Sequence, residues 1–225
     1  MKERASIVVE EYLQLIYSLI ANGKRVKAVN LVKRLKSSPS TVHATLSRLQ
    51  RDDLITIGEK KEIEFTPAGF DKAEQLTRRH RLVEDFLCNT LGISWHEVHK
   101  HAHVLEHGLT EMVEEKLAEF LDFPKSCPHG TPLPGEDSHL PEDMCCLHDM
   151  EMGDVVEIVI IDELLEESVD LMKFLQDKNC TPGQQHTVME KTDITKTVIL
   201  ESENSRATLP FDIADKIGVI KISST

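Results

Sequence analysis

The first stretch of the chain has the spacing of amphipathic helices. From Val8 to Ile20, apolar side chains recur at steps of three and four residues, and Asn22-Gly23 is a typical helix end. Val26 to Leu35 predicts a second helix. Ser37-Ser38-Pro39-Ser40 then supplies a turn and an N-cap for a third helix from about Ser40 to Arg51. Two helices joined by so short a turn predict a helix-turn-helix.

The third predicted helix has one apolar and one polar face. Val42, Leu46 and Leu49 are expected to pack inward, which leaves the polar positions toward a DNA groove. The residues predicted to bind DNA are Lys36, Ser38, Ser40, Thr41, His43, Arg48 and Arg51. Among them, Ser40, Thr41 and His43 are expected near bases, and the three cations near phosphates. A small helical bundle without a DNA partner is the alternative interpretation.

Two short alternating runs follow the third helix. Leu54–Ile57 and Lys61–Phe65 alternate apolar and polar side chains, and Gly58 lies in the turn between them. They predict a β-wing beside the recognition helix, after which Thr66-Pro67-Ala68-Gly69 begins another helix. A wing strengthens the interpretation as a DNA-binding module.

Charge is divided unevenly along the 225 residues, whose formal net charge is −13. Residues 1–79 contain 15 lysines and arginines against 10 acidic residues, whereas residues 80–225 contain 11 against 29. Attraction to phosphates depends on the local face and not on the total charge, so an N-terminal module that faces a polyanion is compatible with an acidic chain.

The last third of the chain changes character. From Gly153 onward it is rich in β-forming runs, with Thr181-Pro182-Gly183 as a turn after a short helix near Leu171. The runs are Val155–Ile161, His186–Met189, Thr197–Leu200 and Ile217–Ile222. They predict a small β-barrel. The acidic residues between the first two runs, Glu163, Glu166, Glu167 and Asp170, are interpreted as a solvated surface on a helix.

Two clusters at helical spacing suggest metal binding. His80 and Glu84 are one turn apart, and His99, His103, Glu106 and His107 fall within about one third of a helix circumference. Imidazole nitrogen and carboxylate oxygen suit borderline divalent ions. A solvated polar face is the alternative in a chain with 11 histidines. His101 lies on the opposite side of the helix and is expected to face solvent.

The hydropathy of the chain indicates its expected cellular location, and this location indicates the state of its cysteines. No N-terminal stretch resembles a signal peptide and no run could span a bilayer, so a soluble, cytoplasmic protein with no membrane partner is expected. The five cysteines are then thiols and not disulfides. Cys127 with His129, and Cys145-Cys146 with His148, lack a paired CxxC spacing and do not by themselves predict a zinc site.

Four segments together resemble one known family. They are Glu10-Glu11-Tyr12-Leu13 with Ile16-Tyr17, the run Arg79–Glu84, the helix from Val98-His99 to Glu106-His107, and Cys127-Pro128-His129-Gly130 with Pro132 and Pro134-Gly135. In these the chain resembles the diphtheria-toxin-repressor family of metal-dependent transcriptional regulators. The resemblance implies a mainly α protein with β-structure. Its expected parts are a winged helix-turn-helix at 1–75, a helical metal-binding and dimerisation domain at 76–140, a linker at 141–152 and an SH3-like β-barrel at 153–225.

The same resemblance implies two metal sites. The regulatory site would comprise Glu11, His103, Glu106 and His107, and the ancillary site His80, Glu84 and His99. The third-domain carboxylate that completes the ancillary site is expected to be Glu167 or Asp170. Glu11 and His103 replace softer ligands found in iron-sensing relatives, which favours Mn(II), with Fe(II) next and Zn(II) as a further option.

The function expected is that of a metal-activated repressor. A homodimer would bind a double-stranded DNA operator and control metal-ion homeostasis. Two alternatives use the His/Glu cluster without DNA: a metallohydrolase and a metal-storage or scaffold protein. No HExxH motif, nucleophile or spare general base accompanies the cluster, so the chain is not expected to be an enzyme.

Overall fold

The structure is a computed structural model that describes residues 2–21, 23–135 and 139–224. The chain divides into two compact units, Met1–Arg79 and His80–Thr225, and each is described by itself. Over the described residues, no helix has both the length and the apolar character needed to cross a bilayer.

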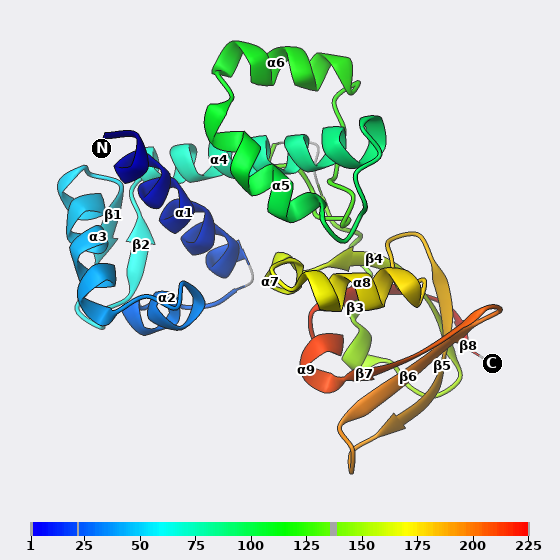
Figure 1. Cartoon of the computed structure of the whole chain (residues 1–225). Helices are drawn as coiled ribbons and strands as arrows, with labels where there is room; N and C mark the ends of the chain where they lie inside the picture. The colour runs from blue at the N-terminus through cyan, green and yellow to red at the C-terminus, as the bar shows by residue number, and fades with distance from the viewer. Residues whose placement is uncertain (1, 22, 136–138, 225) are drawn as a thin grey trace. The chain divides into compact units, whose positions relative to one another are not determined.

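The first unit is a winged helix-turn-helix, as predicted (Figure 1). Its elements are α1 Lys2–Ala21, α2 Ala28–Arg34, α3 Pro39–Arg51, β1 Ile55–Ile57, β2 Ile63–Phe65 and the first part of α4 Pro67–Asp85. Its core is one cluster that joins α1, α2 and α3, with Leu13, Leu31 and Leu46 almost completely buried. The helices are therefore held by the apolar stripes that the sequence displays.

Local chemistry fixes where α3 begins. Ser38 is the N-cap, and its hydroxyl accepts a hydrogen bond from the Thr41 backbone N–H at 3.1 Å. Pro39 occupies the first helical position, where its missing N–H costs nothing. The helix starts one residue earlier than predicted, and Val42 and Leu49 are buried as expected.

The wing is a two-stranded antiparallel sheet. Ile55 pairs with Phe65, and Ile57 pairs with Ile63. The turn between the strands closes with a hydrogen bond from the Gly58 N–H to the Glu62 carbonyl at 2.9 Å. Lys60 and Lys61 are exposed at this turn, on the module with the net positive charge.

The second unit begins in the last turns of α4 and continues through a helical region. Its elements are the π-helical turn η1 Phe86–Thr90, α5 Val98–Leu105, the 3₁₀ turn η2 Glu106–Gly108 and α6 Glu111–Phe120. The predicted continuous helix through His107 is wrong in its last turn, because the α-helical path ends at Leu105. A 3₁₀ turn is a common end to a helix, and it changes the direction of Glu106 and His107.

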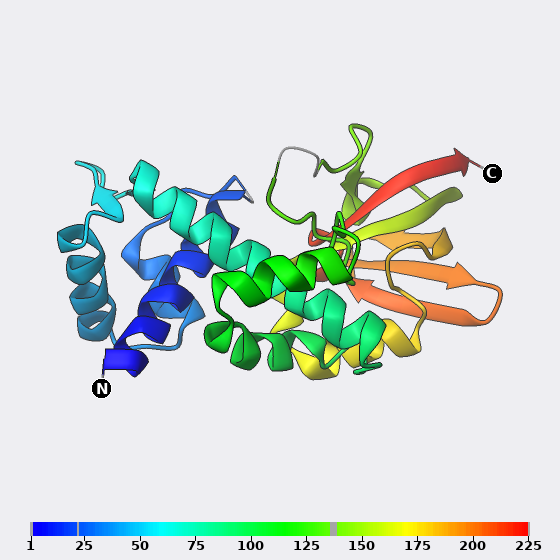
Figure 2. The ribbon, with the colours of Figure 1, turned by 90° about the horizontal axis from the view of Figure 1, so that it is seen from above.

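A six-stranded antiparallel sheet forms the rest of this unit, in the order β3-β8-β4-β5-β6-β7 (Figure 2). The strands are β3 Cys145–Cys146, β4 Asp154–Ile161, β5 Gln185–Thr192, β6 Thr197–Ser202, β7 Ser205–Pro210 and β8 Ile217–Ser224. Short helical elements connect them: η3 Leu147–Asp149, α7 Glu163–Glu166, α8 Val169–Asp177 and α9 Phe211–Ala214.

The sheet differs from the sequence prediction in two places. β7 was not predicted, because only Ala207 and Leu209 of its six residues are buried and the apolar alternation is weak. The segment 141–152, expected as a linker, contains β3, which pairs with β8, and the fully buried Leu147. This segment therefore belongs to the sheet domain, which is the part of the second unit from β3 to β8, and contributes to its core.

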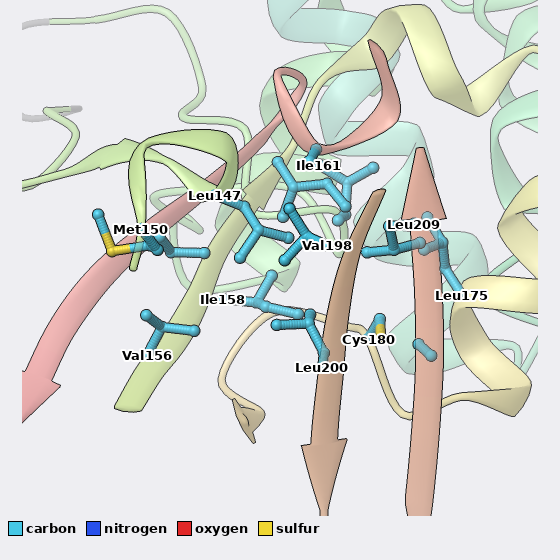
Figure 3. Packing of buried hydrophobic residues seen from close by; sticks show 14 of the residues in the cluster. Leu147, Met150, Val156, Ile158, Ile161, Leu175, Cys180, Val198, Leu200 and Leu209 are labelled. Carbon is cyan, nitrogen blue, oxygen red and sulfur yellow. The ribbon is translucent and has the colours of Figure 1, made fainter. Parts of the chain in front are cut away.

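One cluster of apolar side chains forms the hydrophobic core of the sheet domain (Figure 3). Val156 and Ile158 from β4, with Val198 and Leu200 from β6, are completely buried within it. Leu175 of α8 joins the same cluster, so α8 packs on the sheet through its apolar side. Neighbouring residues of β4 alternate between buried and partly exposed over most of its length, as expected for a strand with one face on a core.

Candidate metal centre

His80, in the last turns of α4, lies at the centre of a buried polar cluster in the second unit. Its Nδ1 is 2.5 Å from Glu106 Oε2, and its Nε2 is 3.0 Å from both Glu84 Oε1 and His99 Nδ1. His80, Glu84 and Glu106 are nearly completely buried. Polar groups so far from water need partners, and here each partner is itself a strong metal ligand.

Glu166 completes the cluster from the sheet domain. Its Oε2 lies 3.0 Å from His99 Nδ1 and 3.2 Å from His129 Nδ1. One ligand atom each from His80, Glu84, His99 and Glu166 lies within 4.8 Å of the other three. Four N and O donors so close together can surround one divalent ion.

The structure corrects the prediction of the third-domain carboxylate. Glu167 and Asp170 are exposed and lie outside the cluster, whereas Glu166 is 3% exposed. Glu166 is therefore not part of a solvated surface. The short helix α7 ends at Glu166, so a shift of one residue along it decides which side chain points inward.

The turn at Cys127-Pro128-His129-Gly130 brings two further side chains with metal-binding chemistry, Cys127 and His129, to the cluster. His129 is fully buried, and its Nδ1 lies 3.6 Å from Glu84 Oε1. Cys127, Glu84 and His129 also form a group with ligand atoms within 4.8 Å. The turn packs closely on β4: a Cβ at Gly130 would lie 1.9 Å from the Val159 carbonyl oxygen, so only glycine fits.

The proximity of Cys127 and His129 to Glu84 is not evident from the sequence. Their spacing is not a paired CxxC motif, and the other half of the set comes from residues 84 and 166. Cys145 and Cys146 lie instead on β3, where their thiols approach the backbone carbonyls of Val219 and Asp215. Neither belongs to any of the ligand groups found among the described residues.

The electrostatics of the cluster favour opposite charges side by side. Burial alone lowers the pKa of His80, but the carboxylates of Glu84 and Glu106 outweigh it and hold this pKa well above its ordinary value. His129 is raised in pKa in the same way by Glu166 and Glu84. For His99, the adjacent Glu166 carboxylate at 3.0 Å, together with the Glu84 carboxylate, outweighs burial and raises the pKa to about 9.

The pKa values of the Glu84 carboxyl and the Cys127 thiol are also shifted by their surroundings. Burial would raise the pKa of Glu84, but His80 and His129 hold it well below its ordinary value. Burial raises the pKa of the Cys127 thiol to about 11, so a cation is needed for it to act as thiolate. The metal-free cluster thus places imidazoles of raised pKa beside carboxylates of lowered pKa.

The residues present fit a divalent ion. His129 Nδ1 and both carboxylate oxygens of Glu166 are buried and have no aligned hydrogen-bond partner among the described residues, although they lie close to one another. Buried polar atoms are normally hydrogen-bonded, so atoms that approach without aligning point to a shared partner. N and O donors of this kind suit borderline divalent ions.

The predicted regulatory ligands in this unit meet around Glu106. Its Oε1 lies 3.6 Å from His103 Nδ1 and 3.6 Å from His107 Nε2. The His103 side chain is 45% exposed and the His107 side chain 10%. Glu11, the fourth predicted ligand, belongs to α1 of the first unit, and its ligation stays a prediction.

The predicted DNA-binding residues lie together on the first unit. Lys36, Ser38, Ser40, Thr41, His43 and Arg51 are exposed, and Arg48 is half-buried. The Ser38 hydroxyl also contacts those of Ser40 and Thr41 at 2.8 Å. Arg48 and Arg51 both approach the Asp52 carboxylate, at 3.6 and 3.2 Å. The turn before α3 and the outer face of α3 therefore present one polar surface.

Three family models match the chain. Residues 6–63 match the iron dependent repressor N-terminal DNA binding domain, residues 66–135 the iron dependent repressor metal binding and dimerisation domain, and residues 145–221 the FeoA domain. The iron-dependent repressor IdeR of Mycobacterium leprae is 30% identical over 223 residues, which cover 95% of this chain and 96% of the relative. The chain belongs to the diphtheria-toxin-repressor family.

Other family members agree over the same length. The diphtheria toxin repressor of Corynebacterium glutamicum is 28% identical and covers 95% of this chain, with 96% of its own length matched. A manganese-dependent transcriptional repressor in complex with manganese has a TM-score of 0.81 at 26% identity, and the match covers 95% of this chain and 100% of that one. ScaR with bound Zn²⁺ has a TM-score of 0.79 at 27% identity, with 95% and 99% covered.

Membership in the diphtheria-toxin-repressor family decides between the functional alternatives. Its members are metal-dependent, DNA-binding transcriptional repressors and not enzymes, so this chain is a repressor of that kind. The predictions of a metallohydrolase and of a storage protein find no support in the comparisons.

Proposed function

We propose that this repressor is activated by one ion bound to Glu11, His103, Glu106 and His107. The observation that supports the proposal best is the buried carboxylate of Glu106, which lies between the two histidines. Glu11 would join the DNA-binding unit to these ligands. Ligation that needs residues of both units stabilises only the arrangement in which all four meet, so the population shifts toward it.

We propose Mn(II) as the preferred activator, with Fe(II) next. The four regulatory ligands offer nitrogen and oxygen and no sulfur, which removes a preference for soft ions. A manganese-dependent repressor and an iron-dependent repressor are both similar to this chain over nearly its full length. Zn(II) would also accept two histidines and two carboxylates.

The ancillary site, in this proposal, uses His80, Glu84, His99 and Glu166, with His129 and Cys127 beside them. A divalent ion there would neutralise the carboxylates and supply a bond between the helical region and the sheet domain. These residues do not need to move far, because their donor atoms are already within 4.8 Å of one another in the two overlapping groups. Its expected role is to brace the second unit.

The DNA operator and the homodimer complete the proposal. Ser40, Thr41 and His43 would contact bases, while Lys36, Arg48, Arg51 and the wing lysines would contact phosphates. A second copy of the chain would cover the apolar side chains exposed on α5 and α6, because exposed apolar patches mark interfaces. They include Val104, Met112, Val113 and Phe120, which are 76%, 73%, 52% and 66% exposed. We place this activity in the cytoplasm, where the DNA is.

A metal-by-metal titration of DNA affinity tests the proposal. We expect Mn(II) to tighten operator binding by the wild-type chain, and His103→Ala and Glu11→Ala each to abolish this activation while metal-free binding stays weak and unchanged. His101→Ala is the matched control, because His101 is an exposed histidine two residues from His103. Wild-type metal dependence in both alanine variants would show that the site is assigned wrongly.

A further inference from the structure

Trp95, the only tryptophan of the chain, holds the turn that carries His129. Its indole Nε1–H donates a hydrogen bond to the Pro128 carbonyl at 2.8 Å. Its own carbonyl oxygen lies 3.1 Å from His129 Nε2. The two rings pack edge to face with centroids 4.8 Å apart. Trp95 therefore contacts the turn through its side chain, its backbone and its ring face.

These contacts fix the orientation of the His129 ring. Because Nε2 keeps its proton to donate to the Trp95 carbonyl, Nδ1 is the nitrogen that faces Glu166 at 3.2 Å and Glu84 at 3.6 Å. A flip of the ring would break the Nε2 hydrogen bond inside a fully buried site. Outer hydrogen bonds of this type set which nitrogen a histidine offers to a metal.

Trp95 is itself held from the sheet domain. It packs against the apolar cluster of the sheet. The next residue, His96, lies with its Nδ1 2.7 Å from Gln176 Oε1 on α8, and its backbone N–H donates to the same oxygen at 3.3 Å. The segment then leads directly into α5, which carries His99. The position of Trp95 is thus set by the same elements that bring the ligands together.

We propose that Trp95 is a positioning residue for the ancillary site, holding His129 with Nδ1 directed at Glu84 and Glu166. This inference rests on the proposed function, since it assigns a role toward an ion at that site. Trp95 would not ligate the ion. It acts through the Pro128 carbonyl and the His129 ring, so its loss should weaken only what His129 contributes.

A double-mutant cycle of metal affinity tests this role. Mn(II) affinity of the ancillary site is measured by competition with a chelating dye in a Glu11→Ala, His103→Ala background, in which the regulatory site is disabled. In that background we expect Trp95→Phe to weaken binding about tenfold, and Trp95→Phe with His129→Ala to be no weaker than His129→Ala alone. Additive losses, or unchanged affinity in Trp95→Phe, would overturn the proposal. His101→Ala serves as the control for a histidine outside the site.

A second variant separates the hydrogen bond from packing. Benzothienylalanine at position 95 keeps the shape of the indole but replaces its N–H by sulfur, so the fold should survive. We expect it to lose affinity as Trp95→Phe does, with an unchanged melting temperature in chelator. Wild-type affinity in this variant would refute the role assigned to the Nε1–H···Pro128 bond.

A metal-free measurement distinguishes failure of this proposal from failure of the metal site. In chelator, the His129 Nε2–H should give a slowly exchanging imidazole NMR signal that exchanges faster in both position-95 variants. Equal exchange in all three proteins would overturn the positioning role. Unchanged Mn(II) affinity in His129→Ala, with the exchange difference present, would show that His129 contributes nothing to metal binding and would overturn the role of Trp95 toward the ion, while the contact that orients the ring stands.

Discussion

His80 and Glu106 contact each other directly, with 2.5 Å between Nδ1 and Oε2. The family resemblance implies different metal sites for them, the ancillary site for His80 and the regulatory site for Glu106. The other Glu106 oxygen faces His103 and His107, so this carboxylate lies between the two ligand sets. Each metal-free set is therefore partly held by a residue of the other.

Glu106→Gln should impair both sites. It removes a charged ligand from the regulatory set and the partner of His80 Nδ1 from the ancillary set. We expect a loss of regulatory Mn(II) binding and a weakening of the ancillary affinity by about tenfold, measured by equilibrium binding with electron paramagnetic resonance. Glu115→Gln, on the exposed side of α6, should bind as wild type. Full ancillary affinity in Glu106→Gln would contradict the coupling.

Glu166→Gln and Glu167→Gln form a matched pair. Glu166 is buried against His99 and His129, whereas Glu167 is exposed. We expect Glu166→Gln to weaken ancillary metal binding by about tenfold or more, and Glu167→Gln to leave it unchanged. A loss of affinity in Glu167→Gln and not in Glu166→Gln would show that Glu167 is the ligand, as expected before the structure.

Metal-free stability should fall as pH rises above neutrality. The folded pKa of His99 is about 9 against an ordinary 6.5, so its contribution is fully present below about pH 6.5 and lost as pH rises through about 9. The raised pKa values of His80 and His129 act in the same direction. Integrated, the His99 shift corresponds to an upper bound of about 3 to 4 kcal/mol of unfolding free energy.

Denaturation in chelator from pH 6 to 9 measures this loss, and His99→Gln should flatten the curve. The lowered pKa of Glu84 predicts a second loss at acid pH, because its contribution is present above its ordinary pKa of 4.5 and disappears as pH falls through the lower folded value. Mn(II) affinity should instead rise with pH, since the ion must displace protons. A stability that increased from pH 7 to 9 would contradict the charge assignment of the cluster.

Arg81 and Glu163 join α4 to the start of α7. The Arg81 guanidinium is buried, donating to Glu163 Oε2 at 3.1 Å and to the Pro132 carbonyl at 2.7 Å. Glu163→Leu leaves this cation without its counter-charge and should cost about 3 kcal/mol of unfolding free energy, measured by urea denaturation in chelator. The double change Arg81→Met, Glu163→Leu should recover part of the loss. Equal stability of all three proteins would show that the pair is unimportant.

Arg51→Ala should weaken DNA binding without changing sequence preference. Arg51 is expected to contact a phosphate, so its loss should reduce affinity for operator and random DNA alike and lower the slope of log affinity against log salt by about 1. His43→Ala should instead reduce discrimination between sequences. Measurements over a range of salt concentrations separate the two. An unchanged salt slope in Arg51→Ala would remove it from the phosphate contacts.

The sequence by itself determined the local features. The helix-turn-helix could be predicted because α1 and α3 display continuous apolar stripes and α3 carries its own cap and proline. His80 with Glu84, and His99 with His103, were found because one helical turn brings such pairs together whatever the rest of the chain does. The resemblance of their surroundings to a known family extended this to the domain order.

The tertiary structure decided everything that depends on contacts between distant segments. Glu166 and His129 join Glu84 and His99 only because α7 and the turn at Cys127–Gly130 pack against the helical region. No spacing in the sequence encodes that approach. The one-residue choice of Glu166 over Glu167 follows from which side of a single helical turn is buried. Periodicity reports which side chains share a face, but packing alone decides which faces meet.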